Sequence, residues 1–143
     1  MGRLYSNMVE INITYEGDLH CKAVHGPSGV TIETDAPVDN QGKGESFSPT
    51  DLLATSLGVC NMTLMGIYAR GHGIDLTGTK IRVEKHMIKE PPRRVEKLVV
   101  EIDLPAGIPT DKRKALENAA LTCPVALSLN PEITVDTEFN YTD

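Results

Sequence analysis

An uncharged stretch of 18 residues, Leu52–Ala69, constrains the fold of this chain more than any other feature. Ser48 and Pro49 stand just before it, and these residue types are favoured at the cap and first position of a helix. Gly71 and Gly73 follow it, and glycine commonly ends a helix. The pattern therefore predicts one long helix. Its apolar residues recur at helical spacing, so one stripe should face the core: Leu53, Leu57, Cys60, Leu64 and Ile67.

A helix from Pro49 to about Arg70 approaches the length of a transmembrane span, which needs about 20 apolar residues. However, the stretch contains hydroxyl and amide groups at Thr55, Ser56 and Asn61, and no basic cluster anchors either end. Hydrogen bonds inside a protein core can satisfy these polar groups. We therefore predict a buried core helix and no membrane partner.

The composition is typical of a single globular domain, which we assign to residues 1–143. A chain of this length can bury about two thirds of the surface that its unfolded form exposes, without disulfides or metals. The net charge of −6 repels nucleic-acid backbones and anionic membranes. Three cysteines are too few for a secreted disulfide scaffold, and the start MGRLYSN lacks a signal-peptide pattern. We therefore expect a cytoplasmic protein with no nucleic-acid partner.

Three segments that alternate between apolar and polar residues come first in the chain and predict an antiparallel meander. The first should be a half-buried strand, and its apolar face would carry Val9, Ile11, Ile13 and Tyr15. The second places Leu19, Cys21 and Ala23 inward, and the third places Val30 and Ile32 inward. A polar loop with two glycines and a proline follows at residues 35–47.

The second half of the chain predicts a long hairpin, a second helix and a final strand. The hairpin turns at residues 90–93, where two prolines interrupt the alternation. Thr110 is expected to cap the second helix, whose core positions are Leu116, Ala119, Ala120 and Cys123. The last strand should face inward with Ile133, Val135, Phe139 and Tyr141. We therefore predict an α+β fold with antiparallel sheets, a long central helix that carries Cys60 and a second helix that carries Cys123.

Cys60 and Cys123 carry the strongest functional signal, because each falls on the core-facing side of a predicted helix. Cysteine often serves as a small buried hydrophobe, so a purely structural role for both thiols stays open. A redox role requires Cys60 to ionise, because the thiolate is the nucleophile. The helix dipole fades after the first turn, so a cation or donor from another segment would be needed. The candidates by residue type are Arg3, His20, Lys22 and Lys43.

Cys21, the third thiol, is expected to be a core residue of its strand. His20 and His25 stand near it and could suggest metal ligands. However, alternation sends His20 and Cys21 to opposite faces of the strand, and no fourth ligand is evident. We therefore predict no metal site.

Two motifs surround the two helix-borne thiols. Ser48-Pro49-Thr50-Asp51-Leu52-Leu53-Ala54 leads through small residues to Cys60, and Thr122-Cys123-Pro124-Val125 ends the second helical pattern. With the order of strands and helices over nearly the whole chain, the motifs resemble the osmotically inducible protein C and organic hydroperoxide resistance (OsmC/Ohr) superfamily. The paired signature is far more specific than either cysteine alone.

The resemblance implies an OsmC-like fold and an intertwined homodimer in which each chain contributes to both active sites. It implies that Cys60 is the peroxidatic thiol and Cys123 the resolving thiol of a thiol peroxidase, which reduces organic hydroperoxides to alcohols in oxidative-stress defence. A small external dithiol, such as a lipoyl group, would be the reductant. Neither a metal nor an organic cofactor is implied.

One position departs from the family's pattern. In its best-understood hydroperoxidases, a glutamate ten residues before the first cysteine pairs with an arginine from the N-terminal sheet, and together they activate the thiolate. Here Thr50 stands at that position, and Arg3 is the only arginine before Cys60. Asp51 and Glu45 are the nearby acids that could support the thiol. An unactivated thiol is ionised to only a few per cent near neutral pH, which keeps a second hypothesis open. In it, the protein binds a small apolar molecule or senses redox state with little turnover.

Overall fold

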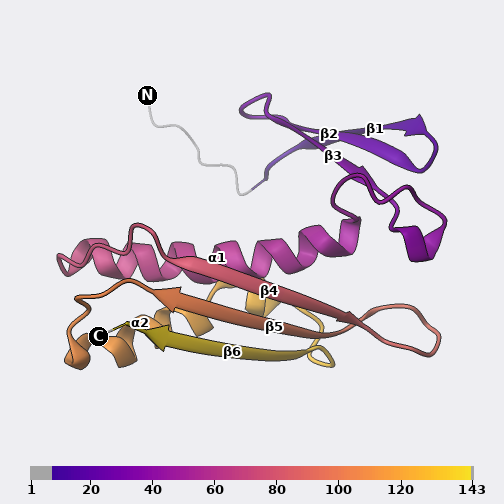
Figure 1. Ribbon diagram of the computed structural model, residues 1–143. Coiled ribbons are helices and arrows are strands. Elements are labelled where there is room, and N and C mark those ends of the chain that lie inside the picture. Colours follow the sequence, from indigo (N-terminus) through magenta and orange to yellow (C-terminus); the bar gives the residue numbers. More distant parts are fainter. Residues whose placement is uncertain (1–7, 143) are drawn as a thin grey trace. The chain divides into compact units, whose positions relative to one another are not determined.

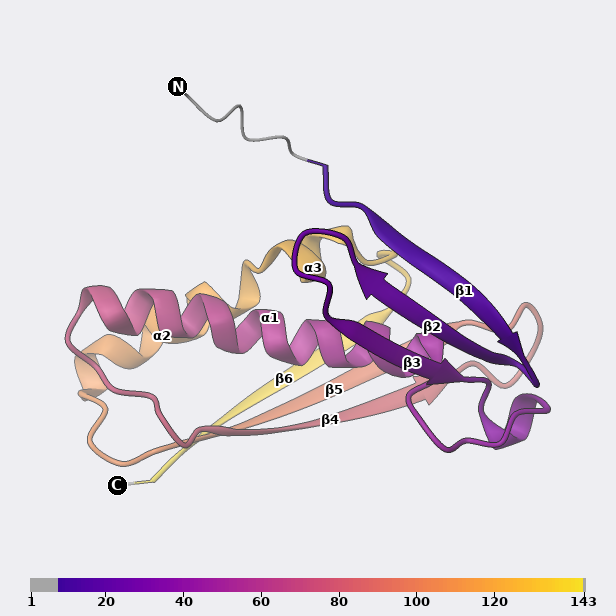
Figure 2. The same ribbon diagram turned by 90° about the horizontal axis from the view of Figure 1, so that it is seen from above.

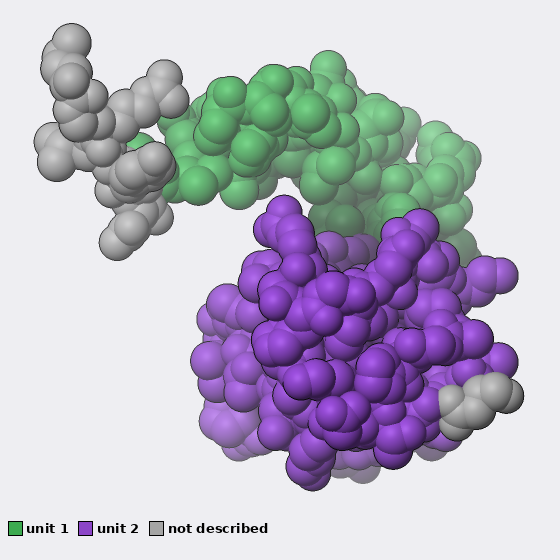
Figure 3. Space-filling model, turned by 90° about the vertical axis from the view of Figure 1, so that its left-hand side faces the viewer, with its two compact units in different colours: residues 1–52 green, residues 53–143 purple. Residues whose placement is uncertain are grey.

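The computed structural model describes residues 8–142, which form an α+β protein (Figure 1). The chain divides into two compact units, residues 1–52 and 53–143 (Figure 3). The first unit contains one three-stranded sheet, and the second contains another such sheet together with most of the helical residues. The single domain expected for residues 1–143 stays a prediction.

The sheet of the first unit is the expected meander. It consists of β1 (Ile11–Gly17), β2 (His20–His25) and β3 (Thr31–Asp35), which pair antiparallel in the order β1-β2-β3. Gly17 ends β1 with a φ of 89°, a conformation that glycine adopts without the strain other residues would suffer. A short 3₁₀ helix, η1 (Val38–Asn40), lies in the loop predicted at residues 35–47.

The apolar face of this sheet is exposed, so the prediction of a half-buried first strand is wrong. The register aligns Ile13 with Ala23 and Ala23 with Ile32, which confirms that the apolar residues share one face. However, Ile13 is 67% exposed and Ile32 is 48% exposed. Alternation in the sequence identifies which residues share a face of the sheet. Burial of that face requires a second layer of structure, and no layer within residues 8–52 covers it.

Helix α1 (Pro49–Gly71) begins where the sequence predicts. The Ser48 hydroxyl accepts a hydrogen bond from the Asp51 N–H at 3.0 Å, and the Asp51 carboxylate accepts one from the Ser48 N–H at 2.9 Å. This reciprocal pair satisfies two backbone donors at the helix start, as in a capping box. The start of α1 is therefore defined by local chemistry.

By length and composition, α1 meets the criteria for a membrane span. Its most apolar 18-residue window has a mean hydropathy of 1.4, and 33% of that window is buried inside the protein. A single helix of this kind is weak support for a span, because core helices of soluble proteins meet the same criteria. The absence of a membrane partner stays a prediction.

The sheet of the second unit is mixed. β4 (Lys80–Met87) and β5 (Val95–Leu104) form the predicted antiparallel hairpin, whereas β6 (Thr134–Tyr141) pairs with β5 in parallel. The prediction of purely antiparallel sheets is therefore wrong for this sheet. Helices α2 (Thr110–Leu121) and α3 (Pro124–Ser128) carry the chain back along the sheet, so that β6 runs in the direction of β5.

Helices α1 and α2 lie on the same face of this sheet (Figures 1 and 2). Alternate residues of β5 point toward them, and the largest completely buried side chains of the unit include Leu57, Met65, Leu98, Ile102 and Leu116. A Cβ added to Gly58 would lie 2.8 Å from the Val83 Cγ2 atom, so α1 approaches β4 closely at this point. Thr110 is the first residue of α2 and not its cap; the N-cap position is Pro109, which makes no side-chain cap hydrogen bond.

We expect Gly58→Val to destabilise the fold, because the new side chain would collide with Val83. Overpacking of this kind typically costs about 1–3 kcal/mol of unfolding free energy. Gly66→Ala is the matched control, since a Cβ there meets nothing within 4 Å, and alanine should gain about 0.5–1 kcal/mol. Denaturant unfolding of both variants measures the difference. Equal midpoints for Gly58→Val and the wild type would contradict the close helix–sheet contact.

Candidate thiol site

Cys60 lies in the middle of α1 and packs against the core of the second unit, as do Leu53 and Leu64 of the predicted stripe. Ile67 is 55% exposed, so the prediction that it faces the core is wrong. Its side chain is partly buried, between Val59, which is 60% exposed, and the buried Asn61. Cys60 therefore combines access from outside with contact to the core. This is the arrangement that a reactive thiol needs.

Cys123 is completely buried and belongs to a different local structure from the one predicted. Helix α2 ends at Leu121, and Cys123 has an extended backbone with φ −71° and ψ 147°. Its sulfur caps α3 by accepting a hydrogen bond from the Ala126 N–H at 3.3 Å. The prediction that Cys123 lies in the second helix is thus wrong by two residues. The physical reason is Pro124, because a residue before proline avoids the helical conformation.

The structure brings Cys60 and Cys123 together. The pKa of the Cys123 thiol is raised, chiefly by burial and also by a hydrogen bond to Cys60 and the charge that Cys60 carries when ionised. Hydrogen bonds from the Ala126 and Val125 N–H groups act in the opposite direction. The contact joins α1 to the α2–α3 junction. Sequence reasoning selected both thiols but could not show that they meet.

Asn61 is a residue of this site that sequence reasoning missed. Its side-chain N–H₂ group donates to the Ala120 carbonyl at 2.8 Å and to the Cys123 sulfur at 3.4 Å. The residue is 2% exposed. An asparagine in an apolar helix often has no functional role, so its presence alone does not indicate a site. The only sequence signal for Asn61 was its position directly after Cys60.

The acids named as supports for Cys60 have other partners in the first unit. The Asp51 carboxylate accepts the Ser48 N–H in the helix cap, and the Thr50 hydroxyl lies 3.3 Å from the Ser48 hydroxyl oxygen. The Glu45 side chain is exposed, and its backbone N–H donates to the Asp35 carboxylate at 2.9 Å. A supporting role for Asp51 or Glu45 stays a prediction.

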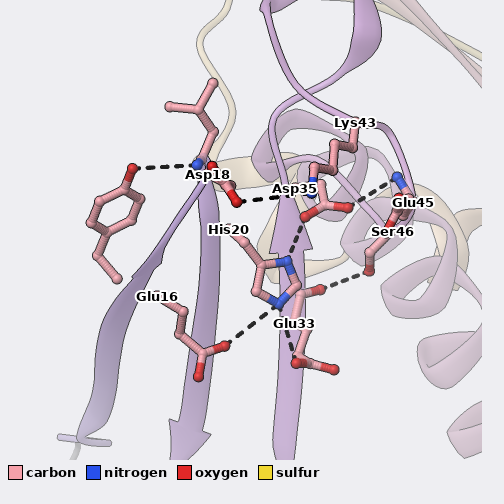
Figure 4. A network of polar contacts seen from close by, with 10 residues as sticks. Glu16, Asp18, His20, Glu33, Asp35, Lys43, Glu45 and Ser46 are labelled. Carbon is pink, nitrogen blue, oxygen red and sulfur yellow. Dashed lines mark hydrogen bonds and ion pairs between the residues drawn. The ribbon is translucent and has the colours of Figure 1, made fainter.

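Two of the candidate cations join a polar network on β1–β3 (Figure 4). The His20 ring donates through Nδ1 to the buried Asp35 carboxylate at 2.5 Å, and its Nε2 lies 3.1 Å from the Glu33 carboxylate. The Lys43 ammonium lies 3.9 Å from the Asp18 carboxylate. The other two candidates are Lys22, which is exposed on β2, and Arg3, which lies outside the described residues.

Within residues 8–142, one group could hold a metal: Glu16, His20 and Glu33, whose ligand atoms lie within 4.8 Å of one another. When His20 is protonated, its ring can form ion pairs with Glu16, Glu33 and Asp35. The absence of a metal site stays a prediction. His20 faces away from Cys21, because Cys21 pairs with Tyr15 and Thr34 on the opposite face. The set His20, Cys21 and His25 therefore does not converge.

Comparison with known proteins decides the family. The model of the OsmC-like protein family matches residues 42–138, which is more than half of the chain and includes both thiols. The chain belongs to the OsmC-like family. This confirms the resemblance inferred from the two cysteine motifs.

Solved structures agree with this assignment. The OsmC-like chain is 46% identical to a protein of Psychrobacter arcticus 273-4, provisionally described as an osmotic stress induced and detoxification response protein. The TM-score is 0.88, and the match covers 96% of this chain and 99% of that one. The Legionella pneumophila organic hydroperoxide resistance protein OsmC is 15% identical, with a TM-score of 0.73 over 97% and 99%. The Bacillus subtilis organic hydroperoxide resistance protein OhrB is 14% identical, with a TM-score of 0.64 over 93% and 98%. At these lower identities the likeness is one of fold. A comparison with curated proteins finds no significant match.

The His20–Asp35 pair should make stability depend on pH. Their hydrogen bond raises the pKa of His20 above 6.5 and lowers the pKa of Asp35 below 3.8. A raised histidine pKa stabilises the fold below pH 6.5, and this contribution is lost as the pH rises through the folded-state value. A lowered carboxyl pKa stabilises above pH 3.8, and its contribution is lost as the pH falls.

We therefore expect His20→Gln to lose most stability relative to the wild type between about pH 4 and pH 6.5, and less on either side of that window. Denaturant unfolding across this pH range measures the difference. His25→Gln is the control, because the His25 ring contacts the Ser28 hydroxyl and not a carboxylate. A difference between His20→Gln and wild type that does not vary with pH would contradict the ion pair.

Proposed function

We propose that this OsmC-like protein reduces organic hydroperoxides to alcohols, with Cys60 as the peroxidatic thiol and Cys123 as the resolving thiol. The observation that carries the proposal is the contact between a partly exposed and a completely buried thiol. The family assignment supports it, as do the names of the Legionella and Bacillus proteins that share the fold. Such an activity would serve oxidative-stress defence.

The different exposure of the two sulfurs supports this division of roles. Cys60 is accessible enough to meet a hydroperoxide, whereas Cys123 has no exposed surface. Burial and the neighbouring Cys60 raise the pKa of Cys123, which favours its protonated, less nucleophilic form. The buried thiol is therefore suited to the second step.

The reaction balances with these groups and an external dithiol. The Cys60 thiolate attacks the O–O bond, which breaks to give a Cys60 sulfenic acid and, after protonation, the alcohol. Cys123 then attacks the sulfenic sulfur, and a Cys60–Cys123 disulfide forms with the release of water. A small dithiol of the lipoyl type, oxidised to its own disulfide, restores both thiols through a mixed disulfide.

We also propose that the protein works as a cytoplasmic homodimer. Support comes from apolar side chains that the single chain leaves exposed, both on the first sheet and on α1, because contiguous apolar patches usually mark an interface. They include Ile13 on β1, Ile32 on β3, and Val59 and Ile67 on α1. A second copy of the chain would remove them from water.

Ile67→Glu should weaken such a dimer, because Ile67 is 55% exposed in the single chain and a charge there would be buried in the interface. Ile67→Leu, which keeps the apolar surface, is the control. Analytical ultracentrifugation over a range of concentrations measures the dissociation. A wild-type protein that sediments as a monomer at all concentrations would exclude the dimer.

One observation favours a second candidate function, the binding of a small molecule with little peroxide turnover. An open hollow of about 530 Å³ lies at the end of α1, with Met62, Gly66, Ile74 and Leu76 in its wall and Arg70 beside them. Its volume is within the range of small-ligand pockets. Native mass spectrometry that finds a co-purified molecule, together with no peroxide-dependent disulfide, would favour this function over the first.

Substitution of each thiol tests the peroxidase directly. Cys60→Ser should lose all hydroperoxide consumption supported by a dithiol, because no nucleophile remains. Cys123→Ser should react once and then accumulate sulfenic acid or over-oxidised Cys60, detectable by mass spectrometry. Cys21→Ser is the control and should behave as the wild type, since Cys21 lies on the sheet of the first unit. If the wild type and Cys60→Ser consumed a panel of hydroperoxides at the same slow rate, the proposal would fail.

A further inference from the structure

The buried amide of Asn61 links α1 to the resolving thiol. Asn61 follows Cys60 in the sequence, and its N–H₂ group reaches two acceptors of the α2–α3 segment. One is the Ala120 carbonyl, near the end of α2, and the other is the Cys123 sulfur. The first contact ties the end of α2 to α1. The second reaches the sulfur that the proposed reaction requires.

The orientation of this amide follows from its neighbours. With the opposite assignment, the Asn61 carbonyl oxygen would face the Ala120 carbonyl oxygen at 2.8 Å, and two acceptors would oppose each other. The nitrogen therefore points toward Ala120 and Cys123. Both of its donors are directed at the junction.

The Asn61 carbonyl oxygen is the only buried side-chain nitrogen or oxygen without a hydrogen-bond partner among the described residues, 8–142. An unpaired buried acceptor destabilises a fold, and a leucine of similar volume would avoid this cost. The single hydrogen bond that anchors α2 does not explain this cost, because the net contribution of one hydrogen bond to stability is small. The donor to the Cys123 sulfur is the contact for which an apolar residue is no substitute.

We propose that Asn61 is a positioning residue for Cys123, which holds its sulfur toward Cys60 and favours its thiolate. This inference rests on the proposed peroxidase function and adds a residue to it. The Cys123 sulfur accepts hydrogen bonds from Asn61 at 3.4 Å and from the Ala126 N–H at 3.3 Å. Two fixed donors on one sulfur stabilise negative charge there.

The effect falls on the second step of the reaction. Cys123 must lose its proton as its sulfur attacks the Cys60 sulfenic acid, so that the S–S bond forms and the hydroxyl leaves as water. Burial makes the ionisation of Cys123 less favourable, and the hydrogen bonds from Asn61 and Ala126 partly offset that effect. Asn61 also favours Cys123 as the leaving thiolate when the external dithiol attacks the disulfide at Cys60, since the better-stabilised thiolate leaves faster.

The test replaces the amide by an apolar side chain of similar size, Asn61→Leu, with Asn61→Ala as a second variant in case leucine does not fit. The variant is oxidised once with one equivalent of an alkyl hydroperoxide. The ratio of Cys60–Cys123 disulfide to Cys60 sulfenic acid should fall by about tenfold, and more Cys60 should be over-oxidised. Asn118→Leu, the same change at an exposed position of α2, is the matched control and should leave this ratio unchanged.

A second measurement needs no peroxide. In a Cys21→Ser, Cys60→Ser background, Cys123 is the only thiol left. Its thiolate can be followed by ultraviolet absorbance after subtraction of the tyrosine signal of a variant without cysteine. Adding Asn61→Leu should raise its pKa by about one unit, because a donor to the charged sulfur is lost. A purely structural role would change denaturant stability and leave this titration alone.

The two measurements separate the possible failures. An unchanged Cys123 titration and an unchanged ratio in both Asn61 variants would overturn the inference. If the wild type consumed no hydroperoxide while Asn61→Leu still raised the pKa of Cys123, the peroxidase proposal would fail and the action of Asn61 on the thiol would stand.

Discussion

The contact of α1 with the sheet of the second unit is the constraint on which the rest of this structure depends. Gly58 lets the helix approach β4, and the buried side chains of the next turns fix its rotation about its own axis. With that rotation fixed, Cys60 and Asn61 face the α2–α3 junction. The thiol pair is therefore a consequence of helix packing, since no local motif joins the two cysteines.

The same junction explains why the two sulfurs differ. Pro124 stops Cys123 from continuing the helical backbone, and the sulfur turns to cap α3 inside the core. Burial makes its ionisation costly, while backbone and amide donors reduce that cost. Cys60 lies on the more accessible side of the contact. The two thiols of this OsmC-like chain therefore differ in burial and in their surroundings.

The polar groups before and within the first turn of α1 form structural contacts. Asp51 completes the helix cap with Ser48, and Asp35 orients His20 while it accepts the Glu45 N–H. Several acids and cations that are candidates for thiol activation by residue type form these structural contacts instead. The family position held by Thr50 is part of the same hydroxyl-lined helix start. This distribution of partners explains why residue type and proximity in sequence were insufficient to name an activating group.

The sequence by itself determined the elements, the family and the two thiols, because capping residues, alternation and the motifs around Cys60 and Cys123 act over a few residues. It could not determine the parallel pairing of β6, the exposure of the β1–β3 face or the role of Asn61. Strand direction depends on the path that α2 and α3 take, burial depends on what covers a face, and an amide acquires a partner only when distant segments meet. Tertiary packing alone decided these features, since each is a contact between segments that no local pattern links.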